Sequence, residues 1–331
     1  MRAGLALVAL LAVSACGGSL KLTKIDSSAQ RPSNVAVYFT VDTHDGEPVA
    51  GLTADKFKIY EDDSPVSVLE SKQTILNPEV SATHYTLLLV DMSGSVSSSD
   101  DVPVITQSAS AFATRVEKFQ KVAVYAFDGS TQIHPIAGFG SGGSATSGIS
   151  RLSEYKPQDP STNLNGAVIE GLKLLDQQMR ASSTPLTFGT LVVFTDGTDR
   201  ASRVKREQLD AALDKKNVDV MVIGVGAEID GGELNAIGRD GAIVSKDRAQ
   251  ISASFDKMAA RIEAMSKRYY LLGYCSPARA GKHVVRVETH AAGQGGSIEY
   301  EFNADGFTPN CDPNRPPNFD IRRPRGPRPG A

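Results

Sequence analysis

The sequence predicts an α/β fold built on a doubly wound, mostly parallel sheet, with flanking β-strands that form a small β-sandwich-like domain. Short aliphatic runs, typical of buried strands, alternate in the middle of the chain with segments in which apolar residues recur every three or four positions. The 331 residues are enough for one α/β domain and a smaller second one. The expected strands are 85–90, 121–127, 189–194 and 218–225, and the expected helices span 105–119, 164–179 and 251–265.

Alternating apolar and polar residues on both sides of this region predict further strands, for example at 35–41 and 297–302. An isolated hairpin is only marginally stable, so we expect these strands to dock on one another. The two flanking segments, 35–80 and 267–304, form either one β-sandwich into which the α/β domain of residues 83–266 is inserted, or an N-terminal sandwich to which the C-terminal strands are added.

The first residues predict a lipoprotein signal peptide rather than a part of the fold. Met1-Arg2 and the apolar run 3–13 form a charged region followed by a hydrophobic region that is too short to span a bilayer. The next residues, Val13-Ser14-Ala15-Cys16, resemble the lipobox of bacterial lipoproteins, in which the cysteine is acylated and becomes the new N-terminus. We therefore expect a signal peptide at 1–15 and a lipid on Cys16. An ordinary signal peptide is the alternative.

The residues after Cys16 predict a flexible tether. Gly17-Gly18-Ser19 and the polar stretch up to Asn34 are typical of a linker, here 16–34, that holds a domain away from a bilayer. By resemblance to lipoprotein sorting in bacteria with two membranes, Gly rather than Asp after the cysteine favours the outer membrane. We expect a lipid-anchored protein of the cell envelope, on the periplasmic or surface face, with no membrane contact besides the lipid.

The other two cysteines predict a disulfide. With Cys16 lipidated, Cys275 and Cys311 are the remaining pair, and an oxidising envelope favours a bond between them. Two free thiols are the alternative. Residues 305–331 are rich in Pro, Asn and Arg, a composition that predicts a disordered tail.

Charge and motifs exclude several functional classes. The net charge is −3 and both signs are mixed along the chain, which leaves no basic face for nucleic acid. The glycines of 138–143 match GxGxxG, but a Gly/Ser loop follows instead of a helix, so we expect no nucleotide site. The five histidines lie in no metal-ligand or triad spacing, and no GxSxG elbow surrounds Ser93. Catalysis therefore has little support.

Oxygen-bearing side chains follow or precede the predicted elements at three places. Asp91, Ser93 and Ser95 follow the strand 85–90, Thr162 precedes a helix, and Asp196 follows the strand 189–194. The carboxyl ends of strands in an open α/β sheet are where ligands bind. Oxygen ligands without nearby His or Cys favour Mg²⁺, Mn²⁺ or Ca²⁺ over zinc. The alternative for the first loop alone is a turn with a helix cap.

These three segments together resemble the metal-ion-dependent adhesion site of von Willebrand factor A domains. DxSxS, then Thr before Asn-Leu, then a strand ending in Thr-Asp-Gly occur in order, and the resemblance spans roughly residues 83–265. It implies a Rossmann-like fold in which Ser93, Ser95 and Thr162 supply oxygens to the cation, while Asp91 and Asp196 bind it directly or through water. Residues 46–62 are similar to the short β segment that precedes the A domain in bacterial envelope proteins of this type.

The resemblance implies a function in adhesion. Neutral hydroxyl ligands leave the cation only partly neutralised, so an acidic side chain of a protein partner is expected to complete its coordination. The sequence thus predicts an envelope lipoprotein that is no enzyme and binds a protein partner presenting Asp or Glu through a divalent cation. A metal-assisted hydrolase using the same oxygens, and a scaffold with a purely structural metal, are the alternatives.

Overall fold

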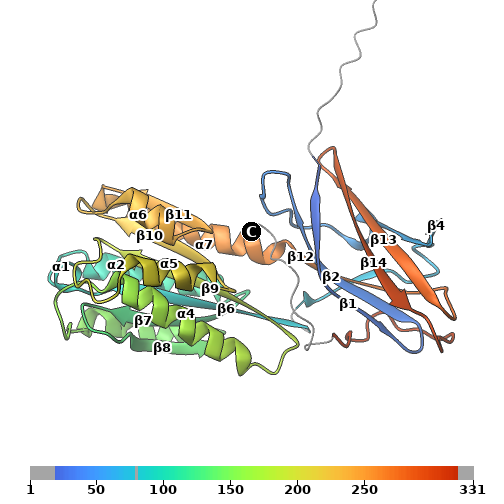
Figure 1. The fold of residues 1–331 in the computed structure, drawn as a ribbon, viewed down its shortest axis with the longest axis horizontal. Helices are drawn as coiled ribbons and strands as arrows, with labels where there is room; N and C mark the ends of the chain where they lie inside the picture. Colours follow the sequence, from blue (N-terminus) through green and yellow to red (C-terminus); the bar gives the residue numbers. More distant parts are fainter. Residues whose placement is uncertain (1–18, 79–80, 320–331) are drawn as a thin grey trace, which may run out of the picture.

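The computed structural model describes residues 19–78 and 81–319 and divides them between an α/β domain and a β-sandwich (Figure 1). The predicted signal peptide and Cys16 lie outside the described residues. The α/β domain is built on a six-stranded sheet in the order β11-β10-β9-β6-β7-β8. Its strands are β6 (Ala82–Asp91), β7 (Lys121–Phe127), β8 (His134–Gly140), β9 (Leu186–Thr195), β10 (Asp219–Val225) and β11 (Gly241–Ser245).

Five of these strands run parallel, and β8 pairs antiparallel with β7 at one edge. The mostly parallel α/β sheet that the sequence predicts is therefore confirmed. The expectation that a loop rather than a helix follows residues 138–143 was wrong, because the short helix α3 (Ser144–Gly148) begins directly after Gly143. The first half of the glycine pattern, Gly138-Phe139-Gly140, belongs to β8. Glycines conceal an edge strand from periodicity, since they carry no side chain whose alternation could be read.

Helices cover both faces of the sheet because its central strand sends alternate side chains to opposite sides. In β6, Leu88 and Val90 pack with the helices of one face, whereas Leu87 and Leu89 pack with those of the other. The first face carries α2 (Val102–Val116), α3 (Ser144–Gly148), η3 (Ile149–Glu154) and α7 (Ile251–Lys267), and the second carries α4 (Leu164–Arg180), α5 (Arg206–Asp214) and α6 (Gly231–Ile237). The short α1 (Gly94–Ser97) and η4 (Arg248–Gln250) lie in connecting loops.

The β-sandwich is made from both ends of the chain. One sheet has the order β1-β2-β12-β5 and the other β14-β13-β3-β4. Since β2 pairs with β12 and β3 pairs with β13, the N- and C-terminal segments form one sandwich that the α/β domain interrupts. The strands are β1 (Lys21–Gln30), β2 (Asn34–Asp42), β3 (Phe57–Glu61), β4 (Ser64–Pro65), β5 (Thr74–Leu76), β12 (Tyr269–Cys275), β13 (Lys282–Ala291) and β14 (Gln294–Asn303), with the short η1 (Ala54–Lys56) before β3.

Two sequence predictions about the ends of the chain were wrong. The predicted tether 16–34 contains β1, an edge strand that pairs with β2 from Lys21 to Gln30, with one irregularity between Lys24 and Asp26. The predicted disordered tail is packed as far as the structure describes it, with Phe307 and Phe319 each less than a tenth exposed. Residues 320–331 lie outside the described part. Both segments are polar because one side of each faces solvent, and composition alone does not distinguish such an edge from a linker.

A disulfide fastens the start of this tail. Cys275, the last residue of β12, is bonded to Cys311, with their Cα atoms 5.7 Å apart. Further along, the main-chain oxygen of Asn318 accepts a hydrogen bond from the Ser28 hydroxyl in β1 at 3.0 Å. The C-terminal segment therefore returns across the first sheet of the sandwich.

The two domains are joined where the chain passes from β5 to β6 and from α7 to β12 (Figure 1). Aromatic rings fill this junction: Tyr38 of β2 contacts Phe188 of β9, Tyr269 of β12 and Phe319 of the tail. Beside them, the Arg268 guanidinium donates to the Asp42 carboxylate at 3.1 Å, and both side chains are more than nine-tenths buried. None of the helices in the described residues is long and apolar enough to cross a membrane.

Replacing Arg268 with alanine should lower the free energy of unfolding by about 3 kcal/mol, because the buried Asp42 carboxylate loses its charged partner. The matched control is Arg180→Ala, which removes a guanidinium that is 78% exposed beside Asp176. This control should cost less than about 0.5 kcal/mol. Urea denaturation of both variants measures the difference, and similar losses for the two would contradict a structural role for the buried pair.

Candidate metal centre

Strand pairing brings the two predicted acidic ligands to one edge of the sheet. Asp91 is the last residue of β6, and Asp196 directly follows the last residue of β9. These strands are parallel neighbours in which Val90 lies opposite Phe194. Because parallel strands end at the same edge, both carboxylates lie at the carboxyl edge of the sheet.

Hydrogen bonds link four of the five predicted site residues. The Ser93 and Ser95 hydroxyls are 3.2 Å apart, and the Ser95 hydroxyl donates to Asp196 Oδ1 at 3.0 Å. The backbone N–H of Ser93 donates to Asp91 Oδ1 at 3.0 Å, which curls the loop after β6. The Thr195 hydroxyl holds the other oxygen of Asp91 at 2.7 Å. Two loops that are about a hundred residues apart in sequence thus form one cluster of oxygens.

Thr162 lies in a segment that is held between these two loops. The N–H of Gly94 donates to the Pro160 carbonyl at 2.8 Å, and the Thr162 carbonyl accepts from the N–H of Arg200 at 3.0 Å and of Ala201 at 2.9 Å. A Cβ at position 94 would come within 3.0 Å of Pro160, so glycine permits this close approach. Thr162 itself is only 4% exposed. The structure therefore brings its loop to the cluster.

Asp128, at the end of β7, positions the segment that carries Thr162. Its carbonyl accepts from the N–H of Asn163 at 2.9 Å. Its carboxylate accepts from the N–H of Ser130 at 2.7 Å, the Tyr155 hydroxyl at 2.8 Å and the N–H of Gln158 at 2.7 Å. Burial raises the pKa of Asp128, but these hydrogen bonds lower it by more. The pKa of Asp128 therefore lies below its usual value. Asp128 is therefore an ionised support for the loop.

The solvent exposure of the cluster residues ranges from none to substantial. Asp91 is fully buried, Asp196 is 7% exposed, and Ser95 is exposed. Burial, together with the charge of Asp196, raises the pKa of Asp91 to about 6 in spite of its hydrogen bonds to Thr195 and Ser93. Burial also raises the pKa of Asp196. Two buried carboxylates at one place are costly without a compensating positive charge, so a cation fits this site.

The donor set fits a hard cation rather than zinc. In the described residues, no group of three His, Cys, Asp or Glu side chains converges to hold a metal. A cation bound here would be held by the two carboxylates together with the hydroxyls of Ser93, Ser95 and Thr162. Oxygen donors of this kind suit Mg²⁺, Mn²⁺ or Ca²⁺.

Sequence reasoning missed two charged residues at this site. Arg248, in η4, donates from Nη2 to Asp196 Oδ2 at 3.0 Å and from Nη1 to Asp101 Oδ2 at 2.6 Å. Arg248 follows β11, a strand that the sequence patterns did not predict, so its return to the carboxyl edge could not be anticipated. Asp101 directly precedes α2, and no sequence pattern marks it as part of a site.

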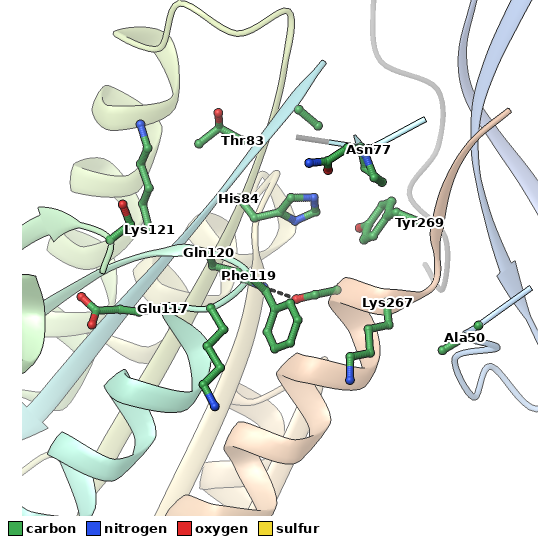
Figure 2. A pocket seen from close by; sticks show the side chains of 16 residues that line it. Ala50, Asn77, Thr83, His84, Glu117, Phe119, Gln120, Lys121, Lys267 and Tyr269 are labelled. Carbon is green, nitrogen blue, oxygen red and sulfur yellow. Dashed lines mark hydrogen bonds between the residues drawn. The ribbon is translucent and has the colours of Figure 1, made fainter. Parts of the chain in front are cut away.

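A large cavity lies at the other end of the central strands. It has a volume of about 860 Å³, and its lining includes His84 near the start of β6, Gln120 before β7 and Tyr269 at the start of β12. Figure 2 shows Lys267, at the end of α7, near Tyr269 on the wall that faces the sandwich. None of the predicted metal ligands lines it. The cavity lies at the domain junction. It is separate from the oxygen cluster at the carboxyl edge of the sheet, which is hereafter the metal edge.

Exchanging Asp91 for asparagine should stabilise the protein in EDTA by about 1–3 kcal/mol at neutral pH, because a neutral amide avoids the cost of a buried carboxylate. Urea denaturation measures the change. Excess Mg²⁺ should stabilise the wild type and leave Asp91→Asn unchanged. An Asp91→Asn protein that is less stable than the wild type in EDTA would show that the carboxylate is already fully compensated by its hydrogen bonds.

Comparison with known proteins gives structural likenesses at low identity. No curated protein matches the chain. A von Willebrand factor type A protein from Catenulispora acidiphila is 13% identical over 89% of this chain and 75% of its own, with a TM-score of 0.44. Proximal thread matrix protein 1 of the mussel byssus is 15% identical over 62% of this chain and 49% of its own, with a TM-score of 0.41. The PilB minor pilin of Streptococcus sanguinis is 9% identical over 74% of this chain and 79% of its own, with a TM-score of 0.40.

These likenesses are too distant to carry an argument, and the assignment rests on the family model. The model of the von Willebrand factor type A domain matches residues 87–262, from the middle of β6 to near the end of α7. The match covers more than half of the 331 residues and includes all five predicted site residues. The chain belongs to the von Willebrand factor type A domain family.

Proposed function

We propose that the α/β domain binds one divalent cation through Asp91, Ser93, Ser95, Thr162 and Asp196, and binds a protein partner through that cation. Mg²⁺ is the first candidate, with Mn²⁺ and Ca²⁺ as alternatives. The observation that carries the proposal is the hydrogen-bonded convergence of Ser93, Ser95 and Asp196 beside the fully buried Asp91, with Ser95 exposed to solvent. A bound cation would supply positive charge to which an Asp or Glu of the partner can bind.

The contacts around the cluster favour adhesion over hydrolysis. A metal-assisted hydrolase needs an acid or base placed over an activated water. In the described residues, the ionisable groups that touch the five cluster residues through hydrogen bonds or ion pairs are the cluster's own carboxylates and Arg248, whose guanidinium keeps its proton. A scaffold with a purely structural metal remains the second alternative, but the exposed Ser95 favours a rim that a partner can reach.

The sequence and the fold together support a place in the cell envelope. The lipobox-like residues before Cys16 support acylation, and the disulfide between Cys275 and Cys311 suits an oxidising compartment. Since β1 begins at Lys21, a lipid on Cys16 would anchor the sandwich close to the bilayer. The metal edge, marked by α1, lies at the far end of the α/β domain from the sandwich (Figure 1). Anchoring at Cys16 would thus direct the metal edge away from the membrane.

Metal binding and partner binding should be lost together. Calorimetry should find one Mg²⁺ or Mn²⁺ site that Asp91→Ala abolishes and that Ser95→Ala or Thr162→Ala weakens about tenfold or more, because all five residues share one ion. Ser98→Ala, which removes an exposed hydroxyl three residues beyond Ser95, is the matched control and should bind normally. Partners captured from an envelope extract by the wild type should be released by EDTA and not captured by Asp91→Ala. Equal capture in EDTA would place the contact surface elsewhere.

Anchoring should depend on a single sulfur atom. Cys16→Ser should leave a soluble protein or an uncleaved precursor, because the thiol that accepts the lipid is gone. Cys275→Ser removes a different sulfur and should keep the anchor while it loses the disulfide. Membrane fractionation with mass spectrometry of the mature N-terminus reports both results. A mature terminus at another residue, without lipid, would refute the lipoprotein assignment.

A further inference from the structure

We propose that Arg248 sets the balance between two affinities at the metal edge: it weakens binding of the cation and strengthens binding of an anionic ligand to the cation once bound. The inference rests on the proposed metal site and assigns a role to a residue outside the five predicted ligands. It concerns the selectivity of that site for a carboxylate partner.

The geometry shows that Arg248 is held in place. Its guanidinium bridges two carboxylates, Asp196 at 3.0 Å and Asp101 at 2.6 Å. The preceding residue, Asp247, accepts from the N–H of Ala249 at 3.0 Å and so fixes the turn that carries Arg248. The fork of an arginine suits such a bridge better than the point charge of a lysine. Arg248 is therefore held both at its guanidinium and through the backbone turn that carries it.

Arg248 touches only one of the two acidic residues of the site. Asp196 shares its carboxylate between Ser95, through Oδ1, and Arg248, through Oδ2. Asp91 is instead bound by the Ser93 N–H and the Thr195 hydroxyl, both neutral donors. Among the described residues, Arg248 is the basic side chain that forms an ion pair with the cluster. It also lies at the rim, since its side chain is 44% exposed.

Charge then determines both effects. The guanidinium offsets the negative charge of Asp196, so the site attracts a divalent cation less strongly than two free carboxylates would. For the same reason, a bound cation is less neutralised by the protein, and an arriving carboxylate meets the positive charge of both the cation and Arg248. Because Arg248 is partly exposed, solvent screens the effect, and we expect a change of about three- to thirtyfold rather than several orders of magnitude.

The test measures the two affinities separately, with Mn²⁺ alone as the first probe and acetate as the second. Calorimetry gives the affinity for Mn²⁺, and water-proton relaxation of the Mn²⁺-loaded protein follows the binding of acetate. Arg248→Ala should bind Mn²⁺ about three- to thirtyfold more tightly and acetate more weakly by a similar factor. Arg248→Lys keeps the charge and should restore part of both values.

Asp101→Asn is the matched control, because it removes the other partner of Arg248 and leaves the contact with Asp196 in place. This variant should not tighten Mn²⁺ binding. If Arg248 serves only to fasten the start of α2, then Arg248→Ala and Asp101→Asn should lose stability alike and keep the wild-type affinity for Mn²⁺. That result would overturn the inference.

The outcomes also separate this inference from the proposed function. If Asp91→Ala still binds Mn²⁺ like the wild type, the metal site itself is wrongly assigned. If Asp91→Ala abolishes binding while Arg248→Ala matches the wild type for both Mn²⁺ and acetate, the site stands and only the role of Arg248 falls. Changes of the same sign in both affinities would likewise contradict a balance set by charge.

Discussion

The approach of two buried carboxylates, Asp91 and Asp196, is the constraint on which the metal edge depends. They are brought together because β6 and β9 are parallel neighbours that end at the same edge. Burying two like charges is unfavourable, and the surrounding loops supply donors for both: the Ser93 N–H and Thr195 hydroxyl for Asp91, and the Ser95 hydroxyl and Arg248 for Asp196. A cation at this point would replace electrostatic repulsion with attraction.

The remaining loops of this edge are arranged around the same point. The Asp128 carboxylate accepts hydrogen bonds from Tyr155 and Gln158, in the segment that leads to Thr162, and from Ser130 in the loop between β7 and β8. Its charge therefore stabilises these loops and does not enter the cluster. Gly94 lets that loop approach the first one closely. The carboxyl edge therefore combines two buried carboxylates, loops that are held together by hydrogen bonds, and the exposed hydroxyl of Ser95. This arrangement is suited to holding an ion near the surface.

The α/β domain is inserted into the sandwich, so the two domains do not follow one another along the chain. The chain enters the α/β domain from β5 and leaves it through α7 into β12, which lies in the same sheet as β5. The buried pair of Arg268 and Asp42 and the aromatic rings around Tyr38 occupy this junction. Any force applied at the carboxyl edge of the α/β sheet would reach the sandwich through these two connections and their packed side chains.

Local patterns were enough to predict the fold class and the oxygen-bearing loops. The buried strands and the long helices have clear periodicities, and 85–90, 164–179 and 251–265 lie within β6, α4 and α7. Asp91, Ser93, Ser95, Thr162 and Asp196 could be identified as candidates because each adjoins such an element. Their contacts with one another, however, required the strand order, in which β6 lies between β9 and β7.

Tertiary structure decided everything that depends on a distant partner. The strand β1 is recognisable only through its pairing with β2, and the tail from 305 to 319 packs through Phe307, Cys311 and Phe319 despite its polar composition. Arg248 and Asp196, which are in contact, lie 52 residues apart in the sequence. Arg248 also follows β11, a strand that the sequence did not predict. The sequence by itself determined which segments bury apolar side chains and where the oxygens stand along the chain, because both follow from local spacing. Which edges pair and which charges meet was settled only by folding, because those contacts join residues far apart in the sequence.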